Sequence, residues 1–293
     1  MAESSTSSLP LWLGLILTPG LGQRGAQHLL EKFKTPEAIY AASLTELEAC
    51  AVSPAVAQQI YQGKSAELGA EEAARAAAAG ARIITQADRT YPELLREIFD
   101  PPIVLYLKGR EDALDQFGIA LVGTRRPTVY GRLMAEKLGA ALAAWGLTVI
   151  SGLARGIDAV GQKACVEQRG QAVAVLGTGI DVIYPHENRG LAEAILDANG
   201  ALISEFPMGT IPAAQNFPIR NRIISGLALG VLVVEGGEFS GSRITARMAL
   251  EQNRDVFAVP GMATQAQAWL PNTLIKQGAK LVTEIADILD ELP

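Results

Sequence analysis

The sequence has only two cysteines and two histidines, and this scarcity excludes several kinds of site. Cys50 and Cys165 are far apart and form no CxxC pair, so neither a zinc site nor a disulfide framework is indicated. Both are expected to be buried in a reducing compartment. His28 and His186 fit no metal-ligand spacing and provide no Ser-His-Asp set. We expect no metal and no cofactor.

Long apolar runs are also missing. Ile223–Val234 has about 12 residues and contains two glycines, which is too short to span a bilayer. Residues 1–8 carry Glu3 and no basic region, which argues against a secretory signal. We expect a cytoplasmic protein with no membrane contact.

Nucleotide motifs are absent or incomplete. There is no Walker A sequence, so ATP hydrolysis is not indicated. Gly177-Thr178-Gly179 lacks the third glycine of a dinucleotide fingerprint, because Val182 occupies that position. Aromatic residues make up only 5% of the chain and charged residues 19%. The net charge of −6 is unusual for a nucleic-acid binder, so DNA binding would need a local basic patch.

What the 293-residue chain does contain is 49% hydrophobic residues, ample for a core. The pattern predicts a disordered tail over 1–8, an all-α module over 9–65 and a helical linker over 66–80. Within the α module, Pro19-Gly20-Leu21-Gly22 resembles a degenerate helix-hairpin-helix turn, which can offer N–H groups to a DNA phosphate. A scaffolding or protein-binding role fits this module equally well. An α/β domain is expected over 81–293.

In that domain short β-branched runs alternate with helical stretches. The expected strands are 82–85, 103–107, 119–122, 148–150, 172–176, 201–204, 231–234, 256–259 and 280–282. The expected helices are 130–145, 157–167, 189–198, 243–252 and 273–277. Near-continuous apolar strands separated by helices predict a doubly wound α/β fold with a mostly parallel sheet.

Ligands of such sheets bind outside the carboxyl ends of the strands. The loops there are Gly123–Pro127, Ser151–Asp158, Gly177–Gly179, Glu205–Pro207 and Glu235–Ser242. Most are rich in Gly, Ser and Thr, and the first two carry arginines. Small residues let the backbone approach an anion, and arginine adds bidentate phosphate recognition. Glycines are common in any strand-to-helix turn, but several such loops at one edge predict a phosphate-binding site.

The segment Gln215–Arg222 combines arginines, amides and an aromatic ring, which suits base stacking with backbone neutralisation. Phe217 is equally suited to core packing. Arg220 or Arg222 would then form an ion pair with Glu205 or Glu235.

The carboxylates and hydroxyls at this edge allow more than one role. Asp158 and Glu235 are better explained as ion-pair partners of arginines than as general bases. Ser151, Ser240 and Ser242 are better explained as phosphate donors or helix caps than as nucleophiles.

Taken in order, these motifs resemble the DprA/Smf family of DNA-processing proteins. The matching runs are Gly123-Thr124-Arg125, Ser151–Asp158, Gly177–Asp181, Tyr184-Pro185, Ser204–Pro207, Asn216–Leu227, Ser240–Ala246 and Arg254–Gly261. The resemblance covers about residues 82–283, and the helical module is also in place.

The resemblance implies an extended Rossmann-like domain preceded by a SAM-like module. It implies dimerisation through the Rossmann-like domain, single-stranded DNA binding and loading of RecA during natural transformation, without catalysis. Arg125 would be the main phosphate clamp and Phe217 a stacking surface. The full set of implied DNA contacts is Gly123, Thr124, Arg125, Arg126, Ser151, Gly152, Arg155, Asn216, Phe217, Arg220, Arg222, Ser240, Gly241 and Ser242.

This chain departs from the family at Arg243, where an apolar residue is usual. Many relatives carry a C-terminal winged-helix module, and we expect none in this sequence, where it is absent or was removed. Two other hypotheses stay open. Glu235-Gly236-Gly237 with Ser240–Ser242 also resembles the phosphate loop of phosphoribohydrolase-like enzymes acting on small nucleotides. Alternatively, the protein is a scaffold for RecA and DNA binding is secondary.

Overall fold

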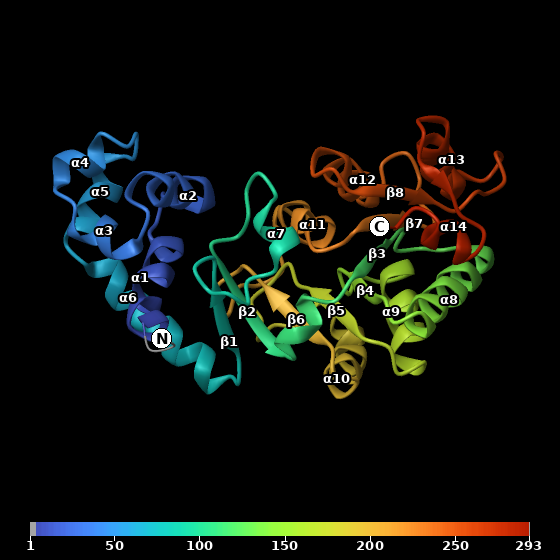
Figure 1. The fold of residues 1–293 in the computed structure, drawn as a ribbon, viewed down its shortest axis with the longest axis horizontal. Helices are drawn as coiled ribbons and strands as arrows, with labels where there is room; N and C mark the ends of the chain where they lie inside the picture. The colour runs from blue at the N-terminus through green and yellow to red at the C-terminus, as the bar shows by residue number, and fades with distance from the viewer. Residues whose placement is uncertain (1–3, 293) are drawn as a thin grey trace. The chain divides into compact units, whose positions relative to one another are not determined.

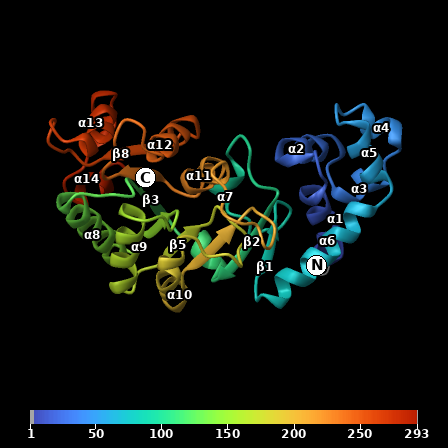
Figure 2. The ribbon, with the colours of Figure 1, turned by 180° about the vertical axis from the view of Figure 1, so that it is seen from behind.

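The computed structural model describes residues 4–292, and these form two compact units (Figures 1 and 2). The first unit runs to Tyr91 and includes Asp100–Leu107, and the second comprises Pro92–Phe99 and the chain from Lys108. None of the helices in the described part of the chain is long and apolar enough to cross a bilayer.

The first unit is a helical module with a β-hairpin. Its helices are α1 (Ser4–Leu17), α2 (Gly22–Phe33), α3 (Pro36–Ala41), α4 (Leu44–Glu48), α5 (Pro54–Tyr61) and α6 (Lys64–Ala78). Thr35, Ser43 and Ser53 cap α3, α4 and α5 through their side-chain oxygens. The hairpin pairs β1 (Arg82–Thr85) with β2 (Val104–Gly109) in antiparallel register.

Two features of this unit differ from the sequence-based expectation. The tail expected over 1–8 is helical from Ser4, and residues 1–3 lie outside the described part. The helix expected to link the modules, α6, packs against α1 instead. A Cβ on Gly69 would lie 1.9 Å from the Pro10 carbonyl oxygen, so the small residue permits this close approach. The hydroxyl of Tyr106 donates to buried Glu72 at 2.8 Å and joins β2 to α6, which groups the hairpin with the helices.

The second unit contains a parallel sheet. Among its described residues the strands are β3 (Gly118–Val122), β4 (Thr148–Ser151), β5 (Ala172–Val175), β6 (Ala201–Ser204), β7 (Gly230–Val233), β8 (Asp255–Ala258) and β9 (Lys280–Leu281). Their order is β6-β5-β4-β3-β7-β8-β9, and every pair is parallel. The chain winds outward from β3 in one direction and from β7 in the other, which places the topological switch point between them. The doubly wound α/β prediction is confirmed.

Helices cover both faces of this sheet. They are α7 (Glu93–Arg96), α8 (Val129–Ala144), α9 (Ile157–Glu167), α10 (Arg189–Asp197), α11 (Asn216–Gly226), α12 (Ser242–Glu251), α13 (Trp269–Lys276) and α14 (Ala286–Leu289). In Figures 1 and 2, α8, α9 and α10 lie on one side of the sheet and α11, α12 and α13 on the other.

The sequence did not predict α11. Its pattern shows little amphipathic contrast because the helix is buried on several sides, and Pro218 stands in its first turn, where a missing N–H is tolerated. This omission matters because α11 carries the Asn216–Arg222 residues into the site.

Candidate functional site

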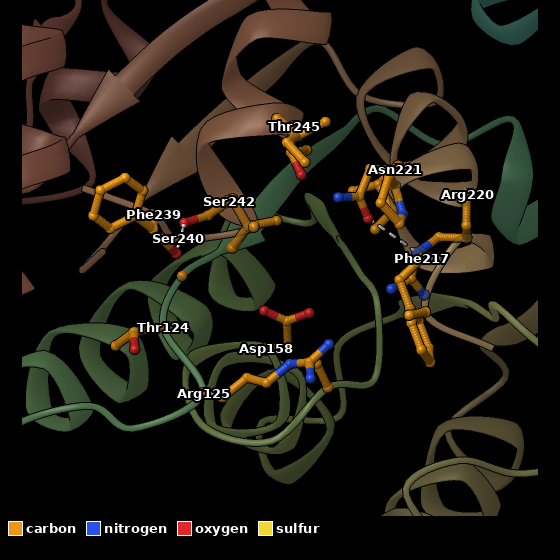
Figure 3. Close-up of a pocket in the computed structure, with 18 of the residues that line it drawn as sticks. Thr124, Arg125, Asp158, Phe217, Arg220, Asn221, Phe239, Ser240, Ser242 and Thr245 are labelled. Atoms are coloured by element: carbon orange, nitrogen blue, oxygen red, sulfur yellow. Dashed lines mark hydrogen bonds between the residues drawn. The ribbon is translucent and has the colours of Figure 1, made fainter. Parts of the chain in front are cut away.

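A pocket of about 880 Å³ lies where the loops after β3 and β7 meet α11. It is therefore at the carboxyl edge of the sheet, beside the switch point, as expected for this fold. Its volume falls in the range of small-ligand pockets. Arg125, Phe217, Phe239 and Thr245 lie around it in Figure 3.

The Gly123–Arg125 loop is held rigidly at the base of this pocket. The N–H of Thr124 donates to the Glu235 carbonyl oxygen at 2.7 Å, and the Thr124 carbonyl accepts from the N–H of Ile157 at 3.2 Å. A Cβ on Gly123 would lie within 2.8 Å of the same Glu235 oxygen, so only glycine fits here. The backbone thus fixes the point from which Arg125 projects.

Arg125 itself is exposed and stacks on an aromatic ring. Its guanidinium carbon lies 5.6 Å from the centroid of Phe217, and the Tyr184 ring packs 5.7 Å from Phe217. This is a cation–π contact supported by a second ring. Phe217 is half-buried in the pocket wall, so its contact with Arg125 indicates that it orients the arginine.

Arg220 has a different role from the one predicted for it. It is buried, and its guanidinium donates to the carbonyl oxygens of Gly152, at 3.0 Å, and Val175. Asp158 is also buried and accepts from the N–H of Gly152 at 3.1 Å. Burial raises the pKa of Asp158 while the charge of Arg220 opposes that rise, and burial lowers the pKa of Arg220 to about 10. The prediction of Arg220 as a phosphate contact is corrected, because its donors join the ends of β4 and β5.

Arg222 also forms its hydrogen bonds within the protein. Its two terminal nitrogens donate to the two carboxylate oxygens of Glu205 at 2.5 and 2.6 Å, and the side chains are only 5% and 7% exposed. The ion pair with Glu205 that the sequence allowed is present, and the prediction of Arg222 as a DNA contact is corrected. Asn216, at the start of α11, is also buried.

The predicted hydroxyl and backbone donors after β4 are not accessible. Ser151 is fully buried and its hydroxyl donates to the Leu121 carbonyl at 2.6 Å. Gly152 is buried against Arg220, whose guanidinium a Cβ there would meet at 2.5 Å. Both positions shape the site without reaching a ligand, which corrects their predicted role.

Arg155 and Arg126 are exposed. Arg155 makes a bidentate ion pair with Glu187, at 2.6 and 2.7 Å, beside the pocket. This pair raises the pKa of Arg155 and lowers that of Glu187. Arg126 lies next to Arg125, and its N–H donates to the Thr124 hydroxyl at 3.2 Å.

The opposite wall of the pocket is the start of α12. Ser240, Gly241 and Ser242 line it, and the two serine hydroxyls are 2.7 Å apart. Gly241 is exposed, and a side chain there would meet nothing within 4 Å. The N–H groups of Arg243 and Ile244 already donate to the carbonyl oxygens of Ser240 and Gly241, at 3.1 and 3.0 Å. The two serine hydroxyls are therefore the donors on this wall that suit an anion.

Two features of the site differ from the sequence analysis: Glu235, expected to pair with an arginine, has another partner, and Phe239 was not identified. Glu235 accepts from the N–H and hydroxyl of Thr128, at 2.9 and 2.5 Å, and so fixes the start of α8. Phe239 stands on the pocket rim, 92% exposed. An aromatic residue inside a Gly- and Ser-rich loop is the signal that could have identified it.

Comparison with known proteins places this geometry in context. The family model described as DNA recombination-mediator protein A matches residues 82–293. Protein Smf of Escherichia coli is 48% identical over 202 residues, covering 69% of this chain and 54% of that protein. DNA processing protein DprA of Bacillus subtilis is 44% identical over 215 residues, covering 73% of this chain and 72% of that protein.

Two solved structures are also similar to this chain. The X-ray structure of DNA processing protein A from Streptococcus pneumoniae gives a TM-score of 0.85 at 33% identity, over 97% of this chain and 96% of that one. The Helicobacter pylori protein, whose structure concerns its single-stranded DNA binding mode, gives 0.64 at 28% identity, over 71% and 94%.

Proposed function

The chain belongs to the DNA recombination-mediator protein A family, and from this premise we propose that it binds single-stranded DNA in the Arg125 pocket. The single observation that carries the proposal is the state of the two arginines that line this pocket in the described part of the chain. Arg220 is buried and its guanidinium donates to backbone carbonyl oxygens. Arg125, in contrast, is exposed and stacked on Phe217.

Arg125 supplies the charge-assisted contact to a phosphate. A guanidinium presents a planar fork of donors, and stacking on an aromatic ring limits the conformations that must be lost on binding. The hydroxyls of Thr124 and Ser240 add further donors to the same anion. A chain of net charge −6 thereby concentrates its DNA contact on one edge.

A single strand suits this site better than a duplex. The pocket is concave and lined by aromatic side chains on both sides, and an unpaired base can enter it and stack. The relative from Helicobacter pylori binds single-stranded DNA, which supports the same choice here.

The protein acts by binding, without catalysis. Glu235 accepts hydrogen bonds from Thr128, and buried Asp158 accepts one from Gly152 and feels the charge of Arg220, so both serve the fold. This use of the two carboxylates favours binding over the phosphoribohydrolase-like alternative. Incubation with nucleoside monophosphates is expected to release no free base, and measurable release would contradict this.

The proposal extends to the partners. A family described as recombination mediators supports delivery of the bound strand to RecA during natural transformation, by a cytoplasmic homodimer joined through the Rossmann-like domain. The test is RecA strand exchange on coated single-stranded DNA, which the protein is expected to accelerate. Light scattering gives the oligomeric state independently.

The direct test is a fluorescence-anisotropy titration of single- and double-stranded oligonucleotides with wild type, Arg125→Ala and Arg247→Ala. Arg247 is the matched control, an arginine 80% exposed and paired with Glu251. Losing a charged hydrogen bond of about 1.5–3 kcal/mol weakens single-strand binding roughly 10- to 150-fold in Arg125→Ala and leaves the control near wild type. Equal affinity of Arg125→Ala and wild type at moderate salt would refute the pocket assignment.

A further inference from the structure

Phe239 is the most exposed large apolar side chain of the second unit's pocket. It is 92% exposed, on the loop between β7 and α12. The free protein therefore leaves the whole ring in water, although burying it would be favourable. In Figure 3 it stands on the side of the pocket opposite Phe217, beside Ser240. The ring is thus available to a ligand that leaves the pocket on this side.

A second aromatic surface adjoins it outside the pocket. The guanidinium of Arg243 lies 5.8 Å from the centroid of Trp269, and Arg243 is exposed. Its Nη1 lies 3.5 Å from the carbonyl oxygen of Glu238, the residue before Phe239. The Phe239 loop and the start of α13 are therefore neighbours.

Backbone bonds hold these two segments together. The N–H of Gly236 donates to the Gln267 carbonyl at 2.7 Å, and the N–H of Leu270 donates to the Gly236 carbonyl at 2.9 Å. The surface formed by Phe239, Arg243 and Trp269, called here the rim platform, is supported by ordered backbone on both sides.

The charges around the rim platform indicate which part of a nucleotide each of its residues can bind. Glu238 is exposed next to Phe239, and its carboxylate disfavours a phosphate there. An aromatic face beside a carboxylate suits a neutral base instead. Arg243 already stacks on Trp269 and keeps donors free for a phosphate, as Arg125 does on Phe217.

We propose that the rim platform is a second nucleotide subsite, in which a base stacks on Phe239 and the adjoining phosphate binds Arg243. This rests on the proposed function, because the strand enters the platform from the Arg125 pocket. The rim platform makes the affinity for single-stranded DNA depend on the length of the strand. A strand that only fills the pocket does not reach Arg243, whereas a longer one engages both arginines.

The test is anisotropy with a labelled oligo-dT series from about 3 to about 20 nucleotides, using Phe239→Ala, Arg243→Ala and Arg247→Ala. Phe239, Arg243 and Arg247 all have exposed side chains, so all three variants should fold. A stacked base contributes about 1–3 kcal/mol, so Phe239→Ala is expected to weaken binding of the long strands roughly 5- to 150-fold. Binding of the shortest strands should stay near wild type.

The salt dependence of binding distinguishes the phosphate contact of Arg243 from the base stacking of Phe239. Arg243→Ala should lower the slope of log Kd against log salt by about 0.7 for long strands, as expected for one lost phosphate contact, and Phe239→Ala should leave the slope unchanged. The subsite is overturned if Phe239→Ala and Arg243→Ala bind every strand as tightly as the Arg247→Ala control. If Arg125→Ala still weakens binding in that case, the pocket assignment stands and only the rim platform fails. If wild type binds no strand at all, both fail.

Discussion

Arg220→Met tests whether this buried arginine organises the pocket or touches DNA. The side chain donates to the carbonyl oxygens of Gly152 and Val175 and faces buried Asp158. Without the guanidinium, buried Asp158 loses the opposing charge that acts on it, and leaving a buried charge uncompensated costs about 3–5 kcal/mol. For a unit of this size that lowers the melting temperature by roughly 6–20 °C. Calorimetry or circular dichroism measures this, with Arg247→Ala as the control.

The pH dependence of the variant has a definite sign. The charge of Arg220 lowers the pKa of Asp158, and burial alone raises it above its unfolded value. In Arg220→Met the folded pKa of Asp158 rises further, so the folded state binds a proton more tightly than the unfolded state. That contribution is present at low pH and is lost as pH rises through the folded pKa. The stability deficit against wild type should therefore be smaller at pH 5 than at pH 8.

Adding Asp158→Asn provides the internal control. With both charges removed, the double variant should recover part of the lost stability, because no charge stays buried alone. If Arg220→Met melts within about 1 °C of wild type, the structural role is refuted whatever happens to DNA binding. Normal stability together with lost DNA binding would return Arg220 to the phosphate contacts.

Three other substitutions separate the remaining roles. Arg222→Met breaks a buried ion pair and should lower stability by about 3–5 kcal/mol in urea unfolding, whereas lost single-strand affinity at unchanged stability would contradict this. Phe217→Leu removes the ring under Arg125 and should weaken binding by about 0.5–2 kcal/mol, or 2- to 30-fold, in anisotropy; a Phe217→Tyr variant that fails to retain affinity would argue against stacking. Glu187→Gln releases Arg155 from its ion pair and should tighten single-strand binding a few-fold at low salt, an effect that must disappear with Arg155→Ala present.

The local pattern of the sequence predicted the second unit well. Strand Ala201–Ser204 and helix Ile157–Glu167 have the expected bounds, and the other elements that were predicted differ by a few residues. Continuous apolar strands alternating with helices have few alternative folds, so the parallel sheet followed from periodicity. The position of the site followed too, because every parallel strand ends at the same edge. Arg125 was found on that basis.

Which arginines reach a ligand was decided by the tertiary structure alone. The sequence does not rank Arg125, Arg220 and Arg222: the first follows Gly123 in a strand-end loop, and the other two follow Phe217. The three arginines differ in how deeply they are buried. Arg222 pairs with Glu205 from another segment, and Arg220 donates to carbonyl oxygens at the ends of two strands. Of these three, Arg125 alone is both exposed and stacked. These contacts join residues far apart in the chain, and a single sequence carries no spacing signal for them. The sequence therefore determined the fold and the edge where a strand can bind, and packing between distant loops decided which cation is free to bind it.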